Sequence, residues 1–388
     1  MCRIVTALVL LSVASPLYAG EPGALPRENF ADAEKAFREA KALLQREYVD
    51  ESVTEDDLYR GAVAGMLAAS GRKWDSLLSP SSLSMMHEEL AGMFVGIGIE
   101  IDTERSYITV IAPIPGSPAD KAGILAGDRI IKIDGRAVKE KGDDTAMYSI
   151  RGKANTPITL TILRETQVIT KTVIRAAIGI VSVSDLSLPS GVTVVWVRTF
   201  NEKTPGLLRA ALQRVAAKSP KGLVIDLRQN QGGLFDKMVE SAALLLPKGA
   251  SVVTEVRRGN REVPVRTEGE PVLRGVPVAV LVNGDTASGA EIFAGALRDT
   301  IGARLVGSKT LGKWNVQKVA DLPNGYAIKY TVGTFKTPKG LAPDGKGLEP
   351  EVPVDLDEKL IDRVQRTLEP TARLAADAQL RAALALLK

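Results

Sequence analysis

One serine stands where a nucleophile could be presented to a substrate. The segment NGDTASGAEIFAGALRD, residues 283–299, reads as the end of an apolar strand, a turn of small residues and a helix. Ser288 falls at the helix start, and its spacing to Glu291 is also that of a capping box. Gly289 and Ala290 would let a peptide backbone approach, and the helix's first N–H groups would face an oxyanion. The segment therefore fits two roles, a structural cap and a nucleophile.

A second strand end carries glycines that could complete such a site. The strand GLVIDLR, residues 222–228, runs into the loop QNQGG before another helix. Ligands of parallel α/β sheets collect at the carboxyl ends of the strands, so this loop is expected to face the same cleft as Ser288. Gly232 and Gly233 are candidates for a second oxyanion donor. A simple turn is the alternative interpretation.

A nucleophilic serine needs a base, and the sequence restricts the choice. His87 is the only histidine and lies in a stretch typical of a protein surface, which excludes sites built on imidazole. Lysine can take this role where burial lowers its pKa enough to leave it neutral. Lys313 precedes an apolar strand and is the candidate base, and Gln317 could orient its amine. The ordinary alternatives are a surface lysine and a polar strand residue.

Two motifs together resemble those of the carboxyl-terminal processing peptidases, which are tail-specific serine proteases. TASGAEIFAGALRD is similar to the nucleophile motif S-A-S-A-S-E-I-x-A-G-A-L-x-D, and GKWNVQ is similar to the motif G-K-x-x-V-Q. The loop DLRQNQGG is similar to D-L-R-x-N-x-G-G. The resemblance implies that Ser288 is the nucleophile, that Lys313, 25 positions later, is its base, and that Gln317 orients the lysine. It also implies an oxyanion hole of glycine amides, Gly289 with Gly232 or Gly233.

The region from residue 88 to residue 177 resembles a PDZ domain. Short β-rich runs surround one short helix that begins near Pro118, and GSPADKAGILAGDRIIKIDG is similar to the protease-type PDZ signature. The resemblance implies that one loop and edge strand bind a terminal carboxylate and an apolar last side chain by strand addition. These residues are Phe94, Val95, Gly96, Ile97, Gly98 and Ile99. Arg151 matches an arginine that can link the occupied PDZ domain to the protease core, and a solvent-exposed turn residue is the alternative.

The N-terminus and the composition restrict location and partners. Residues 1–19 place Arg3 before an apolar run and end in small residues, as in a cleaved signal peptide. The run is shorter than the roughly 20 residues that span a bilayer. Cys2, the only cysteine, lies in this segment, so no disulfide is expected in the mature chain. The 50 basic and 46 acidic residues form no stripe, which argues against nucleic acid as a partner.

The order of elements predicts an α+β multidomain chain. Apolar residues at helical spacing predict two helices between residues 28 and 70, and Pro80 with two serines then predicts a break. After residue 178 strands alternate with helices, which indicates a mixed α/β core, and the resemblance implies a crotonase/ClpP-like type. The predicted division is a signal peptide (1–19), an N-terminal helical region (20–87), a PDZ domain (88–177), a serine protease core (178–356) and a C-terminal helical segment (357–388).

These features together predict an exported serine endopeptidase of the bacterial periplasm or cell envelope. It would recognise protein or peptide substrates with apolar C-termini and cleave them through an acyl-enzyme, with no metal or cofactor. The sequence leaves open whether an adaptor protein takes part and whether the chain forms a homodimer. The alternative is a catalytically inactive PDZ scaffold that only binds C-terminal tails.

Overall fold

The computed structural model describes residues 32–102, 107–138, 149–357, 360–361, 364–365 and 369–387. The predicted signal peptide, residues 1–19, lies outside the described residues. The chain forms two compact units: the first contains the residues up to Ser79 together with Gln317–Thr331, and the second contains Pro80–Val316 and Val332–Lys388. Neither unit is one continuous stretch of sequence.

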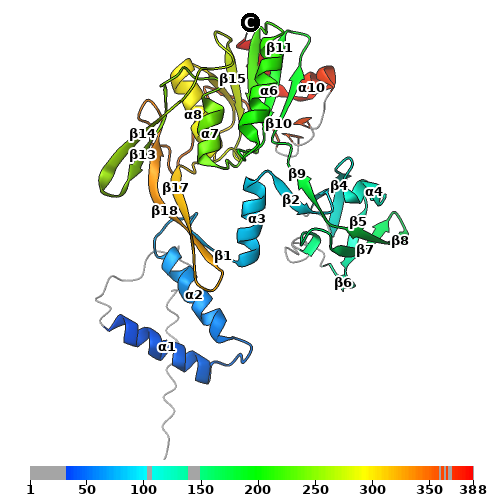
Figure 1. Cartoon of the computed structure of the whole chain (residues 1–388), viewed down its shortest axis with the longest axis vertical. Coiled ribbons are helices and arrows are strands. Elements are labelled where there is room, and N and C mark those ends of the chain that lie inside the picture. Colours follow the sequence, from blue (N-terminus) through cyan, green and yellow to red (C-terminus); the bar gives the residue numbers. More distant parts are fainter. Residues whose placement is uncertain are drawn as a thin grey trace, which may run out of the picture. The chain divides into compact units, whose positions relative to one another are not determined.

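The described residues of the first unit form two helices, one short strand and parts of two longer strands (Figure 1). Its N-terminal elements are α1 (Ala33–Glu47), α2 (Glu55–Ala68) and β1 (Ser76–Leu78). The two helices predicted from apolar spacing are thereby confirmed. Helix α2 begins in a capping box between Thr54 and Asp57. Strand β1 pairs antiparallel with the first residues of β18 (Ala327–Lys336).

A helix opens the second unit at a place where the sequence predicts a break. Helix α3 spans Pro80–Leu90, because a proline is tolerated in the first turn, where its missing N–H has no helical partner. The helix carries His87, which is exposed. The predicted surface position of this histidine is thereby confirmed.

A β-rich module follows α3 within the second unit. Its elements are β2 (Met93–Gly96), β3 (Ile99–Asp102), β4 (Ile108–Pro113), α4 (Pro118–Lys121), β5 (Arg129–Ile133), β6 (Arg136–Ala137), β7 (Pro157–Arg164), β8 (Gln167–Ile174) and β9 (Ala176–Gly179). Among the described residues one sheet has the order β3-β4-β5-β7-β8, and β2 pairs with β9. Alternate residues of these strands fill one core, which includes Ile97, Ile130 and Leu160.

The largest sheet of the second unit is mostly parallel. In spatial order its strands are β10 (Val183–Ser187), β11 (Val192–Val197), β12 (Gly222–Asp226), β15 (Val278–Val282), β16 (Arg304–Gly307) and β19 (Val352–Pro353). The pairs from β11 to β19 are parallel, and β10 joins the edge antiparallel. Strands β11 and β12 are buried along their whole length, as expected for a sheet that is covered on both faces.

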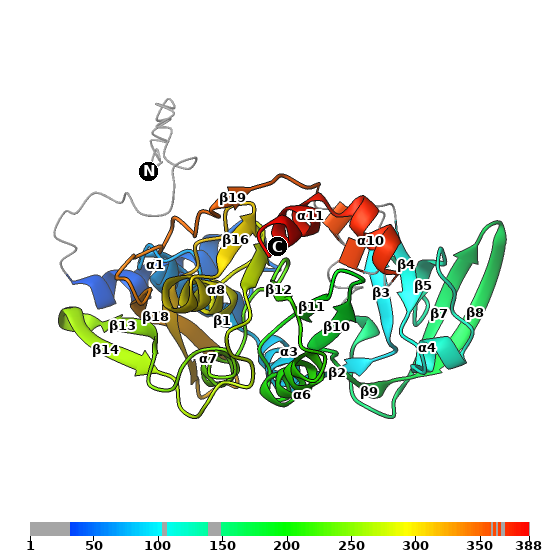
Figure 2. The same ribbon diagram turned by 90° about the horizontal axis from the view of Figure 1, so that it is seen from above.

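Helices cover both faces of this sheet. The helices of one face are α6 (Thr204–Ala216), α7 (Phe235–Ala242) and α8 (Gly289–Ile301), and those of the other are α10 (Pro370–Ala376) and α11 (Ala378–Ala385). Figure 2 shows α11 and α6 on opposite sides of β12. Along β12, Ile225 packs with the first group and Val224 with the residues of α11, so the pleat divides the core in two. The predicted helical C-terminal segment is confirmed by α10 and α11.

A smaller sheet completes the second unit. It contains β13 (Ser251–Arg257) and β14 (Arg261–Arg266), joined by the short helix η1 (Arg258–Asn260), and the last part of β18. Strand β13 pairs antiparallel with β18, with Thr254 opposite Lys336. Strand β17 (Asn315–Asp321), which begins two residues after Lys313, also pairs with β18, and its residues from Gln317 onward belong to the first unit.

Candidate active site

The backbone of Ser288 has a conformation that non-glycine residues rarely adopt. Ser288 is the residue before α8, with φ of 54° and ψ of −122°. Such backbone geometry costs on the order of 1–3 kcal/mol and persists only where the surroundings enforce it. The turn between β15 and α8 therefore presents this serine at the start of the helix in an enforced position. Its side chain is only half-buried.

The loop after β12 is hydrogen-bonded to the turn that carries Ser288. Asn230 O accepts from the N–H of Ala287 at 2.9 Å, and Asn283 Oδ1 accepts from the N–H of Gln229 at 2.9 Å. The Thr286 hydroxyl donates to Leu227 O at 3.0 Å. These bonds join the carboxyl ends of β12 and β15, as the sequence predicts for two strand ends in one parallel sheet.

Gly232 and Gly233 lie where side chains do not fit. A Cβ on Gly232, whose φ is 100°, would lie 2.9 Å from the backbone nitrogen of Gly289. A Cβ on Gly233, whose φ is 137°, would lie 2.2 Å from Phe200 O. Gly232 thus packs directly on the start of α8. The glycines predicted from sequence come together with Ser288.

The two glycine amides have different surroundings. The Gly232 N–H donates to Asn230 Oδ1 at 2.8 Å, so it already has an acceptor. The Gly232 carbonyl accepts from the Phe200 N–H at 2.8 Å. In a trans peptide the following N–H points the opposite way from that carbonyl, so the Gly233 N–H points away from Phe200 N. This orientation favours Gly233 over Gly232 as an oxyanion donor.

One buried carboxylate connects the two predicted catalytic segments. Glu291 lies in the first turn of α8 with no exposed surface. Its Oε2 atom accepts from the N–H of Ser288 at 3.0 Å and from the N–H of Lys313 at 2.8 Å. Its Oε1 atom accepts from the N–H of Gly312 at 2.8 Å and from the Thr310 hydroxyl. The proposed nucleophile and base are therefore held by the same side chain.

The environment of Glu291 disfavours its charge. Burial raises the pKa of this carboxyl above its usual range, and the four hydrogen bonds that it accepts oppose the shift without cancelling it. Each of those bonds requires an acceptor oxygen, which both atoms of the ionised carboxylate provide. The local geometry and the charge state of Glu291 are therefore coupled.

Lys313 is half-buried in a rigid stretch. Gly312 before it has φ of 86° and packs on the backbone of Gly347, and Trp314 after it is fully buried in the main core. The ring of Trp314 packs against α8 at Gly295, where an added Cβ would lie 3.2 Å away. Both neighbours thus fix the backbone of Lys313.

Gln317 belongs to the first unit, whereas Ser288 and Lys313 belong to the second. Its Nε2 atom donates to Trp74 O at 2.8 Å, and the side chain is half-buried. Within the first unit Gln317 therefore has a fixed position. Its predicted role in orienting Lys313 stays a prediction.

The predicted tail-binding residues lie around one groove of about 440 Å³. Phe94, Gly96, Ile97, Gly98 and Ile99 line it, and Val95 lies between them on β2. Arg151 also lines the groove, and its Nη2 atom donates to Glu89 Oε1 of α3 at 3.0 Å. The arginine is therefore part of the groove.

The described residues contain no group of three or more histidine, cysteine, aspartate or glutamate side chains placed to hold a metal ion. Within the same ranges, none of the helices has the length and apolar character needed to cross a membrane.

Comparisons with known proteins agree with the motifs. Residues 191–354 match peptidase family S41, and residues 95–174 match the PDZ domain. A probable CtpA-like serine protease of Staphylococcus epidermidis is 30% identical over 353 residues, which cover 90% of this chain and 71% of that protein. The chain belongs to peptidase family S41.

Other S41 relatives agree with this assignment. A probable CtpA-like serine protease of Staphylococcus aureus strain N315 is 34% identical over 302 residues, which are 77% of this chain and 60% of that protein. The S41 chain thus spans about 60% of the length of this relative. The photosystem II D1 C-terminal processing protease is similar with a TM-score of 0.51 at 28% identity, covering 89% of this chain and 100% of that one. A putative S41 protease from Bacteroides fragilis is similar with a TM-score of 0.57 at 16% identity. The match covers 89% of this chain and 96% of that protein, so the two share the fold.

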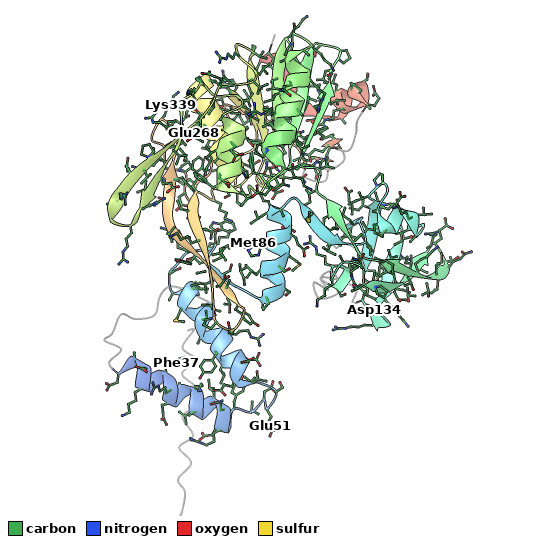
Figure 3. The ribbon with its side chains drawn as sticks, in the orientation of Figure 1. Phe37, Glu51, Met86, Asp134, Glu268 and Lys339 are labelled. Carbon is green, nitrogen blue, oxygen red and sulfur yellow. The ribbon has the colours of Figure 1, made fainter. Side chains whose placement is uncertain are left out.

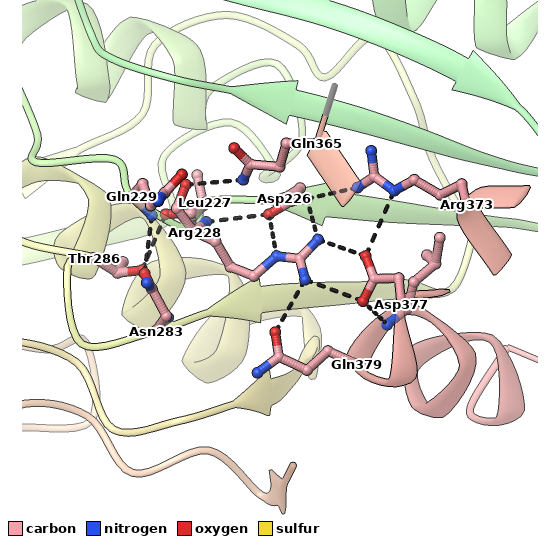
Figure 4. A network of polar contacts seen from close by, with 11 residues as sticks. Asp226, Leu227, Arg228, Gln229, Asn283, Thr286, Gln365, Arg373, Asp377 and Gln379 are labelled. Carbon is pink, nitrogen blue, oxygen red and sulfur yellow. Dashed lines mark hydrogen bonds and ion pairs between the residues drawn. The ribbon is translucent and has the colours of Figure 1, made fainter. Parts of the chain in front are cut away.

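A buried charge network supports the loop after β12 of this S41 chain (Figure 4). Arg228, directly before the loop, donates to both carboxylate oxygens of Asp226 and of Asp377 at 2.6–3.1 Å. Arg373 donates to Asp226 at 3.1 Å and stacks on Trp196, with its guanidinium carbon 4.0 Å from the ring centroid. Arg373 belongs to α10, and Asp377 lies between α10 and α11, where it caps both helices. These helices therefore hold the end of β12 in place.

The two arginines of the network differ. Burial opposes the charge of Arg228, but Asp226 and Asp377 outweigh it and raise the pKa of this guanidinium. Burial lowers the pKa of Arg373. Its Nε and Nη1 atoms have no hydrogen-bond acceptor among the described residues, and Nε makes only a longer ion pair with Asp377 Oδ2 at 3.5 Å. The hydrogen-bonding groups of Arg228 are therefore better satisfied than those of Arg373.

The sequence gives only weak signals for these supporting groups. Glu291 reads there as the glutamate of a capping box, and its N–H contact to Ser288 is indeed of that kind. Its bonds to the Lys313 loop join residues 19 to 22 positions apart and leave no local pattern. Arg373 and Asp377 lie in a helical segment whose charges read as solvated. The signal that their sequence offers for burial is the position of these charged residues among apolar helix residues.

Proposed function

We propose that this S41 chain is an exported serine endopeptidase that recognises C-terminal tails through its PDZ domain and cleaves with a Ser-Lys dyad. The observation that carries the proposal is the shared carboxylate oxygen, because Glu291 Oε2 accepts from the N–H groups of both Ser288 and Lys313. A side chain that ties these two backbone positions together keeps a nucleophile and a base in register. Positioning of this kind is a large part of enzymatic rate enhancement.

The reaction follows from the roles of the side chains. Ser288 Oγ attacks the carbonyl carbon of the scissile peptide while neutral Lys313 Nζ takes its proton. The oxyanion is stabilised by the N–H groups of Gly289 and Gly233. Collapse of the tetrahedral intermediate breaks the C–N bond of the scissile peptide, and Lys313 gives the proton to the leaving amine. Water, deprotonated by the same lysine, then hydrolyses the acyl-enzyme and regenerates Ser288.

Gln317 and Arg151 complete the proposal. The amide of Gln317 orients the lysine amine without adding a charge that would stabilise its protonated form.

Arg151 couples an occupied PDZ groove to cleavage. We expect Arg151→Ala to keep the fold but to uncouple tail binding from cleavage, so that turnover falls even where peptide binding is saturated, as measured by thermal denaturation, peptide binding and reporter cleavage in parallel. Unchanged turnover would contradict the coupling.

Cleavage of a tail-tagged reporter tests the activity. Wild type is expected to cut a reporter that ends in apolar residues, whereas Ser288→Ala and Lys313→Ala are expected to lose at least about 10³-fold in rate. Lys318→Ala, which removes an exposed lysine five positions later, is the matched control and should retain activity. Equal absence of cleavage in all four proteins, with tail binding intact, would support the inactive PDZ scaffold instead.

Export to the periplasm or cell envelope rests on residues 1–19 of the sequence. We expect the N-terminus of the protein recovered from the producing bacterium to be Gly20, which Edman degradation or mass spectrometry would show. Recovery of the intact N-terminus from the cytoplasmic fraction would contradict export.

A further inference from the structure

Helix α3 forms one wall of the groove that lies on the PDZ domain. The groove of about 440 Å³ has apolar residues of the PDZ domain on one side and residues of α3 on the other. The α3 residues are Ser82, Met85, Met86 and Glu89. Figure 3 labels Met86 on this helix. A volume of this size is within the range that binds small ligands or a few peptide residues.

Two neighbouring carboxylates of α3 contact the polar groups of the groove. Glu88 Oε2 accepts from the N–H of Val95 at 3.1 Å. Glu89 Oε1 accepts from Arg151 Nη2 at 3.0 Å, and the Arg151 guanidinium carbon lies 5.6 Å from the centroid of the Phe94 ring. The backbone amide of Val95 on β2 and the guanidinium of Arg151 thus already hold carboxylates from the protein itself.

We propose that α3 is part of the tail-binding site. In this arrangement Met85 and Met86 contact the apolar side chains of the tail, while its terminal carboxylate displaces Glu88 and Glu89 from Val95 and Arg151. The occupant is the C-terminal tail of a protein, with a free carboxylate and apolar last residues. This inference rests on the tail recognition of the proposed function and adds residues outside the PDZ domain to it.

Charge and side-chain chemistry support this occupant. The Val95 N–H lies on β2 between two residues that line the groove, and both it and Arg151 are donors, so this end of the groove accepts an anion. Exchange of one carboxylate for another leaves neither donor unsatisfied. The Glu89 side chain is 53% exposed and that of Arg151 is 34% exposed, so their ion pair is screened by water and is readily displaced. Methionine is unbranched and polarizable, which suits a wall that meets tails of different shape.

The test measures binding separately from cleavage. Full-length protein carrying Ser288→Ala is titrated into a fluorescein-labelled decapeptide that ends in Ala-Ile-Val with a free carboxylate, and fluorescence anisotropy gives the Kd. Met85→Ala and Met86→Ala are expected to weaken binding roughly 5- to 10-fold each, because each removes apolar contact area. Met66→Ala, a 67% exposed methionine of α2, is the matched control and should bind like the parent.

The carboxylates are predicted to act in the opposite direction. Glu88→Ala and Glu89→Ala each remove a competitor of the tail and are expected to tighten binding roughly 2- to 5-fold, with Glu51→Ala as the exposed control. The same peptide with a C-terminal amide should bind the parent at least about tenfold more weakly and should not respond to the glutamate variants.

Each outcome separates this inference from the proposed function. If the parent binds the carboxylate peptide and Met85→Ala and Met86→Ala bind it as Met66→Ala does, α3 is not part of the site. If Glu88→Ala and Glu89→Ala leave binding unchanged or weaken it, the carboxylates do not compete with the tail. If no variant binds the peptide, tail recognition itself fails. Circular dichroism of every variant confirms that binding is compared between folded proteins.

Discussion

Replacing Glu291 by glutamine tests whether one buried carboxylate holds the proposed dyad. The side chain keeps its size, but an amide has one acceptor oxygen where a carboxylate has two. One carboxylate oxygen accepts from the N–H groups of Ser288 and Lys313, and the other accepts from the Gly312 N–H and the Thr310 hydroxyl. Whichever way the amide turns, at least one backbone N–H then faces the NH₂ group.

The magnitude follows from these contacts. Hydrogen bonds to a charged acceptor contribute about 1.5–3 kcal/mol each, and a buried donor without a partner costs about 1–3 kcal/mol. Part of this loss is offset, because burial disfavours the charge of Glu291, as the raised pKa of its carboxyl shows. We expect a net loss of about 1–3 kcal/mol in the free energy of unfolding. A displacement of about 1 Å between reacting groups can lower the rate about 10²-fold, so kcat should fall far more than KM rises.

The assay combines urea denaturation with steady-state cleavage of the tail-tagged reporter at a temperature where all proteins are folded. Glu351→Gln is the matched control, because Glu351 Oε2 accepts from the Leu305 N–H at 2.7 Å outside the site. The control should lose stability and keep kcat within about twofold of wild type, because its contact lies away from the reacting groups. A folded Glu291→Gln protein that also keeps kcat within about twofold would refute the positioning role.

The pH dependence gives a second signature of Glu291. Its pKa in the folded protein is raised above the ordinary 4.5, so its contribution to stability is fully present below 4.5 and is lost as pH rises through the raised value. Acidification through that value should therefore stabilise wild type relative to Glu291→Gln. The same protonation removes an acceptor oxygen, so kcat of wild type should fall. Stability and activity would thus change in opposite directions, which a purely structural role does not predict.

Further predictions concern the loop after β12 and its support. Gly233→Ala should abolish cleavage, because its Cβ would lie 2.2 Å from Phe200 O, whereas Gly206→Ala, on α6 with open space around it, should keep reporter cleavage. In urea denaturation, Arg228→Met should cost about 3–5 kcal/mol of unfolding free energy, since it leaves two buried carboxylates poorly paired. Arg373→Met should cost less, about 1–3 kcal/mol, because two of its nitrogens have no acceptor among the described residues. An equal loss in both would contradict the difference between these arginines.

The elements with a strong periodic pattern could be predicted from sequence. Apolar spacing predicts α1 and α2, and the alternation of strands such as GLVIDLR with helices predicts the mixed α/β core. The predicted break at Pro80 does separate two helices, but Pro80 itself begins α3, because a proline that ends one helical pattern can also occupy the first turn of the next helix. The local sequence cannot distinguish these two uses. Whether a helix follows the proline depends on the packing partners of the next residues, and those partners are distant in sequence.

The candidate site divides in the same way. Ser288, Lys313 and the glycines each fit an ordinary structural role when taken alone, and it is the joint match of their motifs that singles them out without a structure. The groups that hold them could not. Arg228 meets Asp377 across 149 positions, and the Arg151 contact to Glu89 spans 62. Such pairs depend on how the chain folds back on itself, and each partner alone reads as an ordinary surface charge.

Glu291 shows why a local interpretation can be right and still incomplete. A capping box satisfies N–H groups at a helix start, and the carboxylate does accept from Ser288 N. A capping glutamate at a solvent-exposed helix end would remain partly hydrated, whereas this one is fully buried and takes three more donors from the segment 310–313. Burial of a carboxylate is unfavourable unless its acceptor capacity is used. The same fold that buries Glu291 therefore requires the Lys313 loop to close on it, which joins helix capping to the placement of the proposed base.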